Sequence, residues 1–361
     1  MTTTTLPPSP LIPPPSLKSR RLPRWAPWAV AVVSAVIAYL VIYVGGQLRG
    51  GVTMTVVAAA ILFLILLGAA SFSVEGSRAA RNRVVAASIY LACALAALPL
   101  IYLVKTLIGN GLDRFDANFF THSMRDITPF DRDGGAYHAI IGTLQQVAIA
   151  TLITVPLGVG CAIYIVEYGR GRLVKIVQFF VDVMTGIPSI VAGLFILAFW
   201  VIVVSPTFNG GRPGYSGFAA ALALSVLMLP TVTRSSEEML RLVPIALREG
   251  AYALGIPKWK TILKIVLPTA AAGIVTGIML AVARAAGETA PVLLVAGGSD
   301  SINSNPFHGN QESLAVYIYD QARLATKFGA PRAWSAALTL VLLVLILTIA
   351  AKLLSRRSKL R

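Results

Sequence analysis

Residues 241–268 read RLVPIALREGAYALGIPKWKTILKIVLP. Between Ile245 and Leu254 the apolar side chains recur at helical spacing, with an Arg-Glu pair among them, which predicts a short amphipathic helix. Gly255 follows at a position where glycine commonly ends a helix, and Pro257 cannot continue one. A second amphipathic run, Lys258–Leu267, leads to a long apolar stretch. The segment therefore predicts a short helix that lies between two membrane spans.

The sequence around this segment is strongly apolar. Of 361 residues, 56% are apolar and only 13% are charged, about half of the usual quarter. This composition excludes a soluble globular domain and a disordered protein. The apolar residues gather in stretches of about twenty, the length with which a helix crosses roughly 30 Å of hydrocarbon. We therefore expect an all-α, polytopic membrane protein with about eight transmembrane helices.

The expected spans are Trp25–Val44, Val52–Phe72, Val84–Val104, Ala139–Val166, Ile176–Val204, Phe218–Leu240, Thr269–Ala296 and Trp334–Leu354. The fifth and seventh are long and contain Gly and Pro, so we expect them to tilt or break. Gly273 and Gly277 form a GxxxG pattern in the seventh span, which predicts a close approach of another helix.

The net charge of +16 comes from 31 Lys and Arg against 15 acidic residues. If the N-terminus lies in the cytoplasm, 21 of the basic residues fall on the cytoplasmic side and 9 on the outside. Cytoplasmic loops of membrane proteins collect Lys and Arg, so this bias predicts that both termini are cytoplasmic. Basic charge here indicates topology, and we expect no nucleic-acid partner.

Three ionisable residues fall within or beside the predicted spans, where charge is costly and commonly functional. Arg284 and Glu288 are four residues apart, hence neighbours on one helix face. Arg284 also lies about 24 Å along the helix axis from Pro268. Arg234 lies late in the sixth span, toward the cytoplasm. Guanidinium groups suit tetrahedral oxyanions, and two of them at different depths would serve as stepping points for an anion.

Each of these features also has a purely structural interpretation. Arg284 and Glu288 would neutralise each other within one helix, although such a pair still costs desolvation in lipid. Arg234 would be an interfacial cation that snorkels. Asp182, near the cytoplasmic start of the fifth span, either faces the bundle or reaches the interface. The helix at 245–254 would rest on lipid rather than contact a cytosolic partner.

Segment 241–268 also matches the coupling-loop signature of ABC importer permeases: Glu-Ala-Ala, three residues, Gly, nine residues, Ile, any residue, Leu-Pro. The matching residues are Glu249, Ala251, Gly255, Ile265, Leu267 and Pro268. The one departure is Gly250, where the family usually has Ala; glycine lowers helix stability by up to ~1 kcal/mol. The resemblance implies that Glu249, Ala251 and Gly255 belong to an ATPase-coupling loop that docks into a groove of the ATP-binding subunit.

Longer segments resemble the phosphate-specific ABC importer permeases of the PstA type, over roughly residues 85–361. These are GIPSIVAGLF at 186–195, LMLPTVTRSSEEMLRLVP at 227–244, REGAYALGIPKWKTI at 248–262 and ARAAGETAPVLL at 283–294. In that family the residues that match Arg234, Arg284 and Glu288 are implicated in phosphate passage. The resemblance therefore implies a type I importer core with a substrate pathway along these three residues, working by alternating access.

The resemblance also implies partners in the plasma (inner) membrane and beside it. They are a PstB-type ATPase dimer, a PstC-type second permease, an external phosphate-binding protein, phosphate itself and membrane lipid. The chain has no GxxxxGK[ST] loop that would cradle nucleotide phosphates. We therefore expect a transporter subunit rather than an enzyme, with ATP hydrolysis supplied by a separate chain. His and Cys residues show no ligand spacing, so we expect no metal, cofactor or catalytic set.

The expected organisation follows by counting back from the signature, because the family usually has six spans. Residues 1–24 form a disordered, Pro-rich, basic cytoplasmic tail, and residues 25–83 an additional N-terminal transmembrane hairpin. Residues 84–138 hold a transmembrane helix and a polar external loop. Residues 139–361 form the permease core, with the coupling loop at 241–268.

Two other functions remain open from the sequence. A permease for another oxyanion, such as sulfate or molybdate, would use the same Arg and Glu residues. A membrane scaffold or sensor that only modulates the ATPase would need the coupling loop but not the pathway residues.

Overall fold

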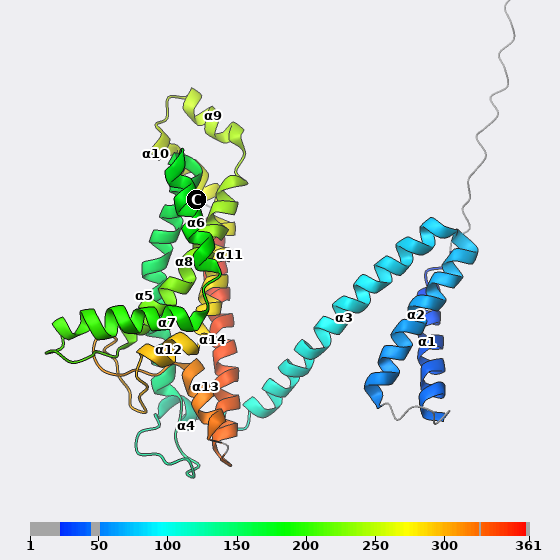
Figure 1. The fold of residues 1–361 in the computed structure, drawn as a ribbon, viewed down its shortest axis with the longest axis horizontal. Helices are drawn as coiled ribbons and strands as arrows, with labels where there is room; N and C mark the ends of the chain where they lie inside the picture. The colour runs from blue at the N-terminus through cyan, green and yellow to red at the C-terminus, as the bar shows by residue number, and fades with distance from the viewer. Residues whose placement is uncertain (1–21, 45–50, 325, 359–361) are drawn as a thin grey trace, which may run out of the picture. The chain divides into compact units, whose positions relative to one another are not determined.

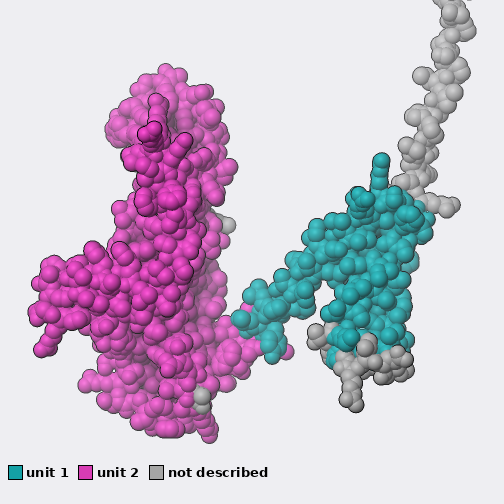
Figure 2. All heavy atoms as spheres, viewed as in Figure 1, with its two compact units in different colours: residues 1–103 teal, residues 104–361 magenta. Residues whose placement is uncertain are grey.

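The structure, a computed structural model, describes residues 22–44, 51–324 and 326–358. Within these ranges the chain is almost entirely helical and contains no β-strand. It divides into two compact units, residues 1–103 and 104–361 (Figure 2). The tail that the sequence predicts at the N-terminus lies outside the described residues as far as residue 21.

Seven helices in the described ranges are long and apolar enough to cross a membrane. They are Met54–Glu75, Ser77–Gly111, Tyr137–Tyr168, Ser189–Thr207, Gly217–Arg241, Lys258–Ala286 and Gly329–Leu353. The all-α, polytopic fold class that the composition predicts is therefore confirmed, and each of the seven overlaps one expected span. The first expected span corresponds to a shorter apolar helix, Ala26–Ile42.

The first unit consists of α1 (Ala26–Tyr39), the π-helical turn η1 (Leu40–Val44), α2 (Val52–Glu75) and the first part of α3 (Ser77–Gly111). Glu75 at the end of α2 is almost fully buried, with 5% of its side chain exposed. It accepts hydrogen bonds from Ser71 Oγ at 2.9 Å and from Arg83 Nη2 at 2.6 Å. This pairing satisfies the charge of Glu75 at the turn between α2 and α3, where an unpaired buried carboxylate would be costly.

The second unit is a bundle built around α8. Its elements are α4 (Ala117–Thr121), α5 (Tyr137–Ile163), η2 (Tyr164–Tyr168), α6 (Arg172–Thr185), α7 (Ser189–Ile196), η3 (Leu197–Val204), η4 (Ser205–Thr207), α8 (Gly217–Arg241), α9 (Ile245–Ala253), α10 (Lys258–Thr261), η5 (Ile262–Val266), α11 (Leu267–Ala286), α12 (Ala290–Val295), α13 (Leu314–Arg323) and α14 (Gly329–Ser358). In α8, 67% of the residues in the most apolar 18-residue stretch are buried, whereas the corresponding stretch of every other candidate span is at most 33% buried. α8 is therefore the central helix, and α9 and α10 lie at one end of the bundle, with α4 at the other (Figure 1).

Both long expected spans are broken, as their Gly and Pro content predicts. The stretch 176–204 ends α6 at Thr185 and resumes as α7 after Pro188, whose carbonyl accepts a hydrogen bond from Val191 N at 3.0 Å. α7 then lies across the bundle rather than along it (Figure 1). The stretch 269–296 ends α11 at Ala286 and resumes as α12, with a proline in its first turn, where the missing N–H is not needed.

The amphipathic run Lys258–Leu267 leads without a break into the next span, because the helix is continuous from Lys258 to Ala286. Pro268 sits in the first turn of α11, directly after the π-helical turn η5. A local π adjustment can accommodate the backbone hydrogen bond that proline cannot make.

The close helix approach that the GxxxG pattern predicts is confirmed between α8 and α11. A Cβ atom on Gly273 would lie 2.1 Å from Met239 Sδ, and one on Gly277 would lie 2.2 Å from Ser235 Oγ. A side chain at either glycine would force the facing Met239 or Ser235 side chain to shift. They also fix the antiparallel register, in which residue 277 lies opposite residue 235.

A left-handed glycine ends α9. Gly255 has φ +73°, its N–H donates to Tyr252 O at 2.9 Å, and Ile256 N–H donates to Ala251 O at 3.1 Å. This pair of bonds is the Schellman arrangement, which satisfies carbonyls at a helix C-terminus. Gly250, in contrast, lies inside α9 with nothing within 4 Å of a Cβ atom placed on it.

We therefore expect opposite effects from two glycine substitutions. Gly255→Ala would cost about 1–2 kcal/mol because an L-residue is strained in the left-handed region. Gly250→Ala would stabilise α9 by up to ~1 kcal/mol through helix propensity. Amide hydrogen exchange over residues 245–254 should become faster in the first variant and slower in the second. Equal exchange in the two variants would contradict this description of α9.

Candidate functional site

The α8–α11 register places Arg284 level with Leu227 and Met228. These three residues line one shallow depression between the two helices, together with Glu288. Arg284 lies in the last turn of α11, at the end of that helix that is far from α9. Its side chain is 60% exposed, whereas that of Glu288 is 17% exposed.

Arg284 and Glu288 form the ion pair that their spacing predicts, but the contact is long. Arg284 Nε lies 3.5 Å from Glu288 Oε1. The pair spans a helix end, because α11 stops at Ala286 and Gly287 caps it. An exposed and loosely held guanidinium retains donors for another acceptor.

Arg234 is held much more tightly. Its Nε donates to Asp182 Oδ1 at 3.0 Å, its Nη2 contacts the same oxygen, and its Nη1 donates to Glu237 Oε2 at 2.7 Å. Asp182 lies on α6, so the contact joins α6 to α8. Asp182 thus contacts the bundle through Arg234, although 61% of its side chain is exposed. The Arg234 side chain is 31% exposed, and its guanidinium group is already paired with the carboxylates of Asp182 and Glu237.

The sequence interpretation missed Glu237, which is the most buried member of this cluster. Only 4% of its side chain is exposed, and it accepts bonds from Arg234, from Arg241 at 2.7 Å and from Gln178 at 3.0 Å. The i,i+3 and i,i+4 spacings to the two arginines were visible in the sequence. The bond to Gln178, 59 residues away, was not.

The two candidate arginines lie along one face at different depths. Leu227, Thr231 and Arg234 stand at i, i+4 and i+7 on α8, so they share a helix face, and Thr231 also lines the depression at Arg284. Because Arg284 is level with Leu227, it lies about 10 Å along the bundle axis from Arg234, at 1.5 Å per residue. The structure therefore brings the predicted pathway residues to one surface without bringing them into contact.

The candidate coupling residues lie elsewhere, at the end of the bundle that carries α9. Glu249 is exposed, Ala251 is 4% exposed, and Gly255 forms the helix end described above. Large apolar side chains of the same segment remain exposed, with Leu254 at 80% and Ile245 at 69%. The segment thus presents an uncovered surface of mixed character.

Glu312, in the loop before α13, is a buried acid outside the spans. Burial raises the pKa of its carboxyl to about 8, although Ser299 N–H donates to Oε2 at 3.1 Å and opposes the shift. A carboxyl with this pKa is mostly protonated at neutral pH.

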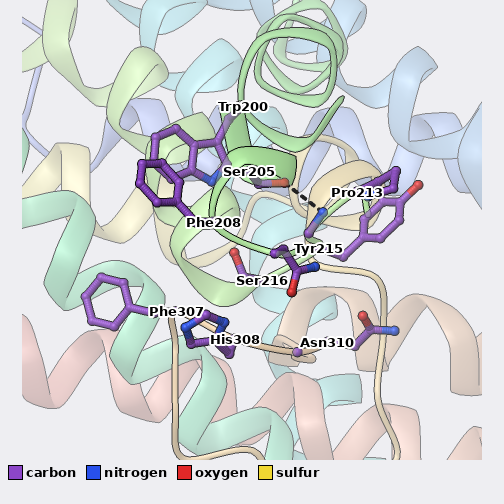
Figure 3. Close-up of a pocket in the computed structure, with 12 residues that line it drawn as sticks. Trp200, Ser205, Phe208, Pro213, Tyr215, Ser216, Phe307, His308 and Asn310 are labelled. Atoms are coloured by element: carbon purple, nitrogen blue, oxygen red, sulfur yellow. Dashed lines mark hydrogen bonds between the residues drawn. The ribbon is translucent and has the colours of Figure 1, made fainter. Parts of the chain in front are cut away.

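A cavity of about 250 Å³ opens between the 205–216 and 307–310 loops (Figure 3). Its wall contains Trp200, Phe208 and Phe307, and Ser205 Oγ accepts a hydrogen bond from Gly214 N–H at 2.7 Å. No Lys, Arg, Asp or Glu lines it. This cavity lacks the cations that an oxyanion site needs, so we do not assign it to the pathway.

Comparison with known proteins agrees with this architecture. Residues 154–360 match the family described as binding-protein-dependent transport system inner membrane component. The chain is 46% identical over 278 residues to the phosphate transport system permease protein PstA 1 of Mycobacterium tuberculosis, covering 77% of this chain and 89% of that protein. It is 36% identical over 278 residues to PstA of Pasteurella multocida, covering 76% and 95%.

Among solved structures, the inward-facing MetNI methionine ABC transporter matches with a TM-score of 0.46 and 20% identity, over 62% of this chain and 94% of that chain.

The seven candidate spans and the family match together define a multi-pass permease of the inner membrane. The chain belongs to the family of binding-protein-dependent transport system inner membrane components, and within that family it is similar to the PstA phosphate permeases.

Proposed function

We propose that this chain is the membrane-spanning permease subunit of an ATP-driven importer that moves inorganic phosphate into the cytoplasm. The observation that carries the proposal is the placement of Arg284 and Arg234 on one face at two depths, in a chain similar to phosphate permeases. A guanidinium fork offers planar, paired donors that match a tetrahedral oxyanion.

Arg284 is the first contact for the anion. Its side chain is 60% exposed, and its guanidinium is only loosely paired with Glu288, at 3.5 Å. Phosphate can therefore reach the guanidinium by breaking only this one weak contact. Glu288 remains beside the bound anion as a like charge, which weakens binding. Passage requires sites from which the anion can also leave.

Arg234 is the second contact, and it is closed in this structure. Asp182 and Glu237 occupy its donors. An anion can bind there only after a carboxylate has moved away, and Asp182 is the one free to move because it is 61% exposed while Glu237 is 4% exposed. Separation of α6 from α8 during alternating access would release Arg234.

The other subunits of the proposed transporter are those that the family resemblance implies. A PstB-type ATPase dimer docks on α9 through Glu249, Ala251 and Gly255, a PstC-type permease completes the pathway, and an external binding protein delivers phosphate. The α9 end of the bundle then faces the cytoplasm, as do both termini, in agreement with the excess of basic residues on that side. Residues 25–83 would add a hairpin to the permease core of 139–361.

We expect Arg284→Gln to lower phosphate uptake at least about tenfold while the complex still assembles, since it removes a charge-assisted contact worth roughly 1.5–3 kcal/mol. Uptake of radiolabelled phosphate into vesicles measures the effect. Arg212→Gln, which removes an exposed loop arginine, is the matched control and should leave uptake unchanged. Wild-type uptake in Arg284→Gln would reject the pathway and favour the scaffold or sensor.

The same assay separates phosphate from other oxyanions. Competition by arsenate but not by sulfate or molybdate is the result expected for a phosphate pathway. Equal competition by sulfate would assign the chain to the other class of oxyanion permease.

A charge reversal at Glu249 tests the proposed docking of the ATPase at α9. Glu249 is exposed on α9, and its side chain has no hydrogen bond or ion pair among the described residues. Glu249→Lys should therefore abolish co-purification of the ATPase by reversing charge at the docking surface. Arg172→Glu reverses an exposed charge at the start of α6 and should retain the ATPase. Recovery of the ATPase with Glu249→Lys at wild-type yield would refute this docking site.

A further inference from the structure

A buried ion pair links α9 to the end of α5. Glu167 lies in η2, which continues α5, and 5% of its side chain is exposed; Arg248 lies on α9 with 14% exposed. Arg248 Nε and Nη2 both donate to Glu167 Oε1, at 3.0 and 2.8 Å. A pair as enclosed as this one depends on both partners, because either charge alone would be buried without compensation.

The same guanidinium also holds the end of α8. Arg248 Nη2 donates to Leu240 O at 2.9 Å, and Nη1 donates to Val243 O at 2.6 Å. These carbonyls belong to the last turn of α8 and the link that follows it, where helix carbonyls have no partner within the helix. One side chain of α9 thus contacts both α5 and α8.

A second cation strengthens the connection to the same turn of α5. Lys258, the first residue of α10, donates to Glu167 O, and its ammonium lies 5.0 Å from the centre of the Tyr168 ring. Residues of both α9 and α10 therefore contact η2. In the described part of the chain, the side-chain hydrogen bonds and ion pairs that tie α9 itself to other elements all come from Arg248.

We propose that Arg248 is a positioning residue that transmits movement of α9 to α5 and α8 together, with Glu167 as its anchor. The inference rests on the proposed docking of an ATPase at α9. A force applied to α9 reaches α8 six residues from Arg234, about 9 Å along the helix axis. Without the ion pair, α9 can move with the ATPase while α5 and α8 stay behind, so ATP hydrolysis continues without transport.

The test uses the assembled transporter, with ATPase, partner permease and binding protein, reconstituted in vesicles. Phosphate transported per ATP hydrolysed is measured together with co-purification of the ATPase. In Glu167→Gln we expect the ATPase to remain bound and the transport ratio to fall about tenfold. The double variant Glu167→Arg/Arg248→Glu should recover several-fold over Glu167→Gln because it restores the ion pair, although not the bonds to the two carbonyls.

Glu75→Gln is the matched control, since Glu75 is also 5% exposed and paired with an arginine at 2.6 Å, but lies in the first unit. It should keep the wild-type ratio. A ratio within twofold of wild type in Glu167→Gln would overturn the proposal. So would loss of the ATPase from both Glu167→Gln and the double variant, with Glu75→Gln intact, since that outcome shows a purely structural role. Failure of the wild-type chain itself to bind an ATPase would instead reject the proposed function.

Discussion

The contact on which the rest of the site depends is the pairing of Arg234 with two carboxylates. Arg234 and Glu237 lie on α8, the most buried helix of the bundle, and only 4% of the Glu237 side chain is exposed. A carboxylate as buried as that of Glu237 must be paired with a positive charge. Asp182 completes the compensation from α6, so a single guanidinium both balances charge and holds two helices together.

The packing of α8 decides what else can reach that surface. Two glycines of α11 allow close approach to Ser235 and Met239, and the resulting register sets Arg284 on the same face as Arg234. At the C-terminal end of α8, Arg248 donates to the carbonyl of Leu240 and to that of Val243 in the link that follows the helix. The two arginines proposed to contact the anion and the arginine proposed to transmit movement of α9 therefore all lie on α8 or against it.

The sequence predicts those features whose cause is local. Apolar stretches long enough to cross a membrane, the helix end at Gly255 and the Arg284–Glu288 pair all depend on residues close in the chain. The Arg234–Glu237 spacing is equally local, but the sequence does not mark it out, because a charge near the cytoplasmic side also has a simple interpretation as a snorkelling side chain.

The contacts that spacing could not reveal join distant segments. Asp182 and Arg234 are 52 residues apart, and Glu167 and Arg248 are 81 residues apart. The first proximity follows from the packing of α6 on α8, and the second from the contact of α9 with η2 at the end of α5. The direction of α7 across the bundle was likewise hidden, because the break at 186–188 predicts a bend but not where the next helix points.

Direct binding of phosphate to the purified transporter, without its external binding protein, tests the central claim that the anion displaces Asp182 from Arg234. Radiolabelled phosphate should bind Asp182→Asn about tenfold more tightly than wild type, a difference of ~1.4 kcal/mol, because a competing charge has been removed. The gain should disappear in the double variant Asp182→Asn/Arg234→Gln. Unchanged affinity in Asp182→Asn, or a gain that persists without Arg234, would contradict the account.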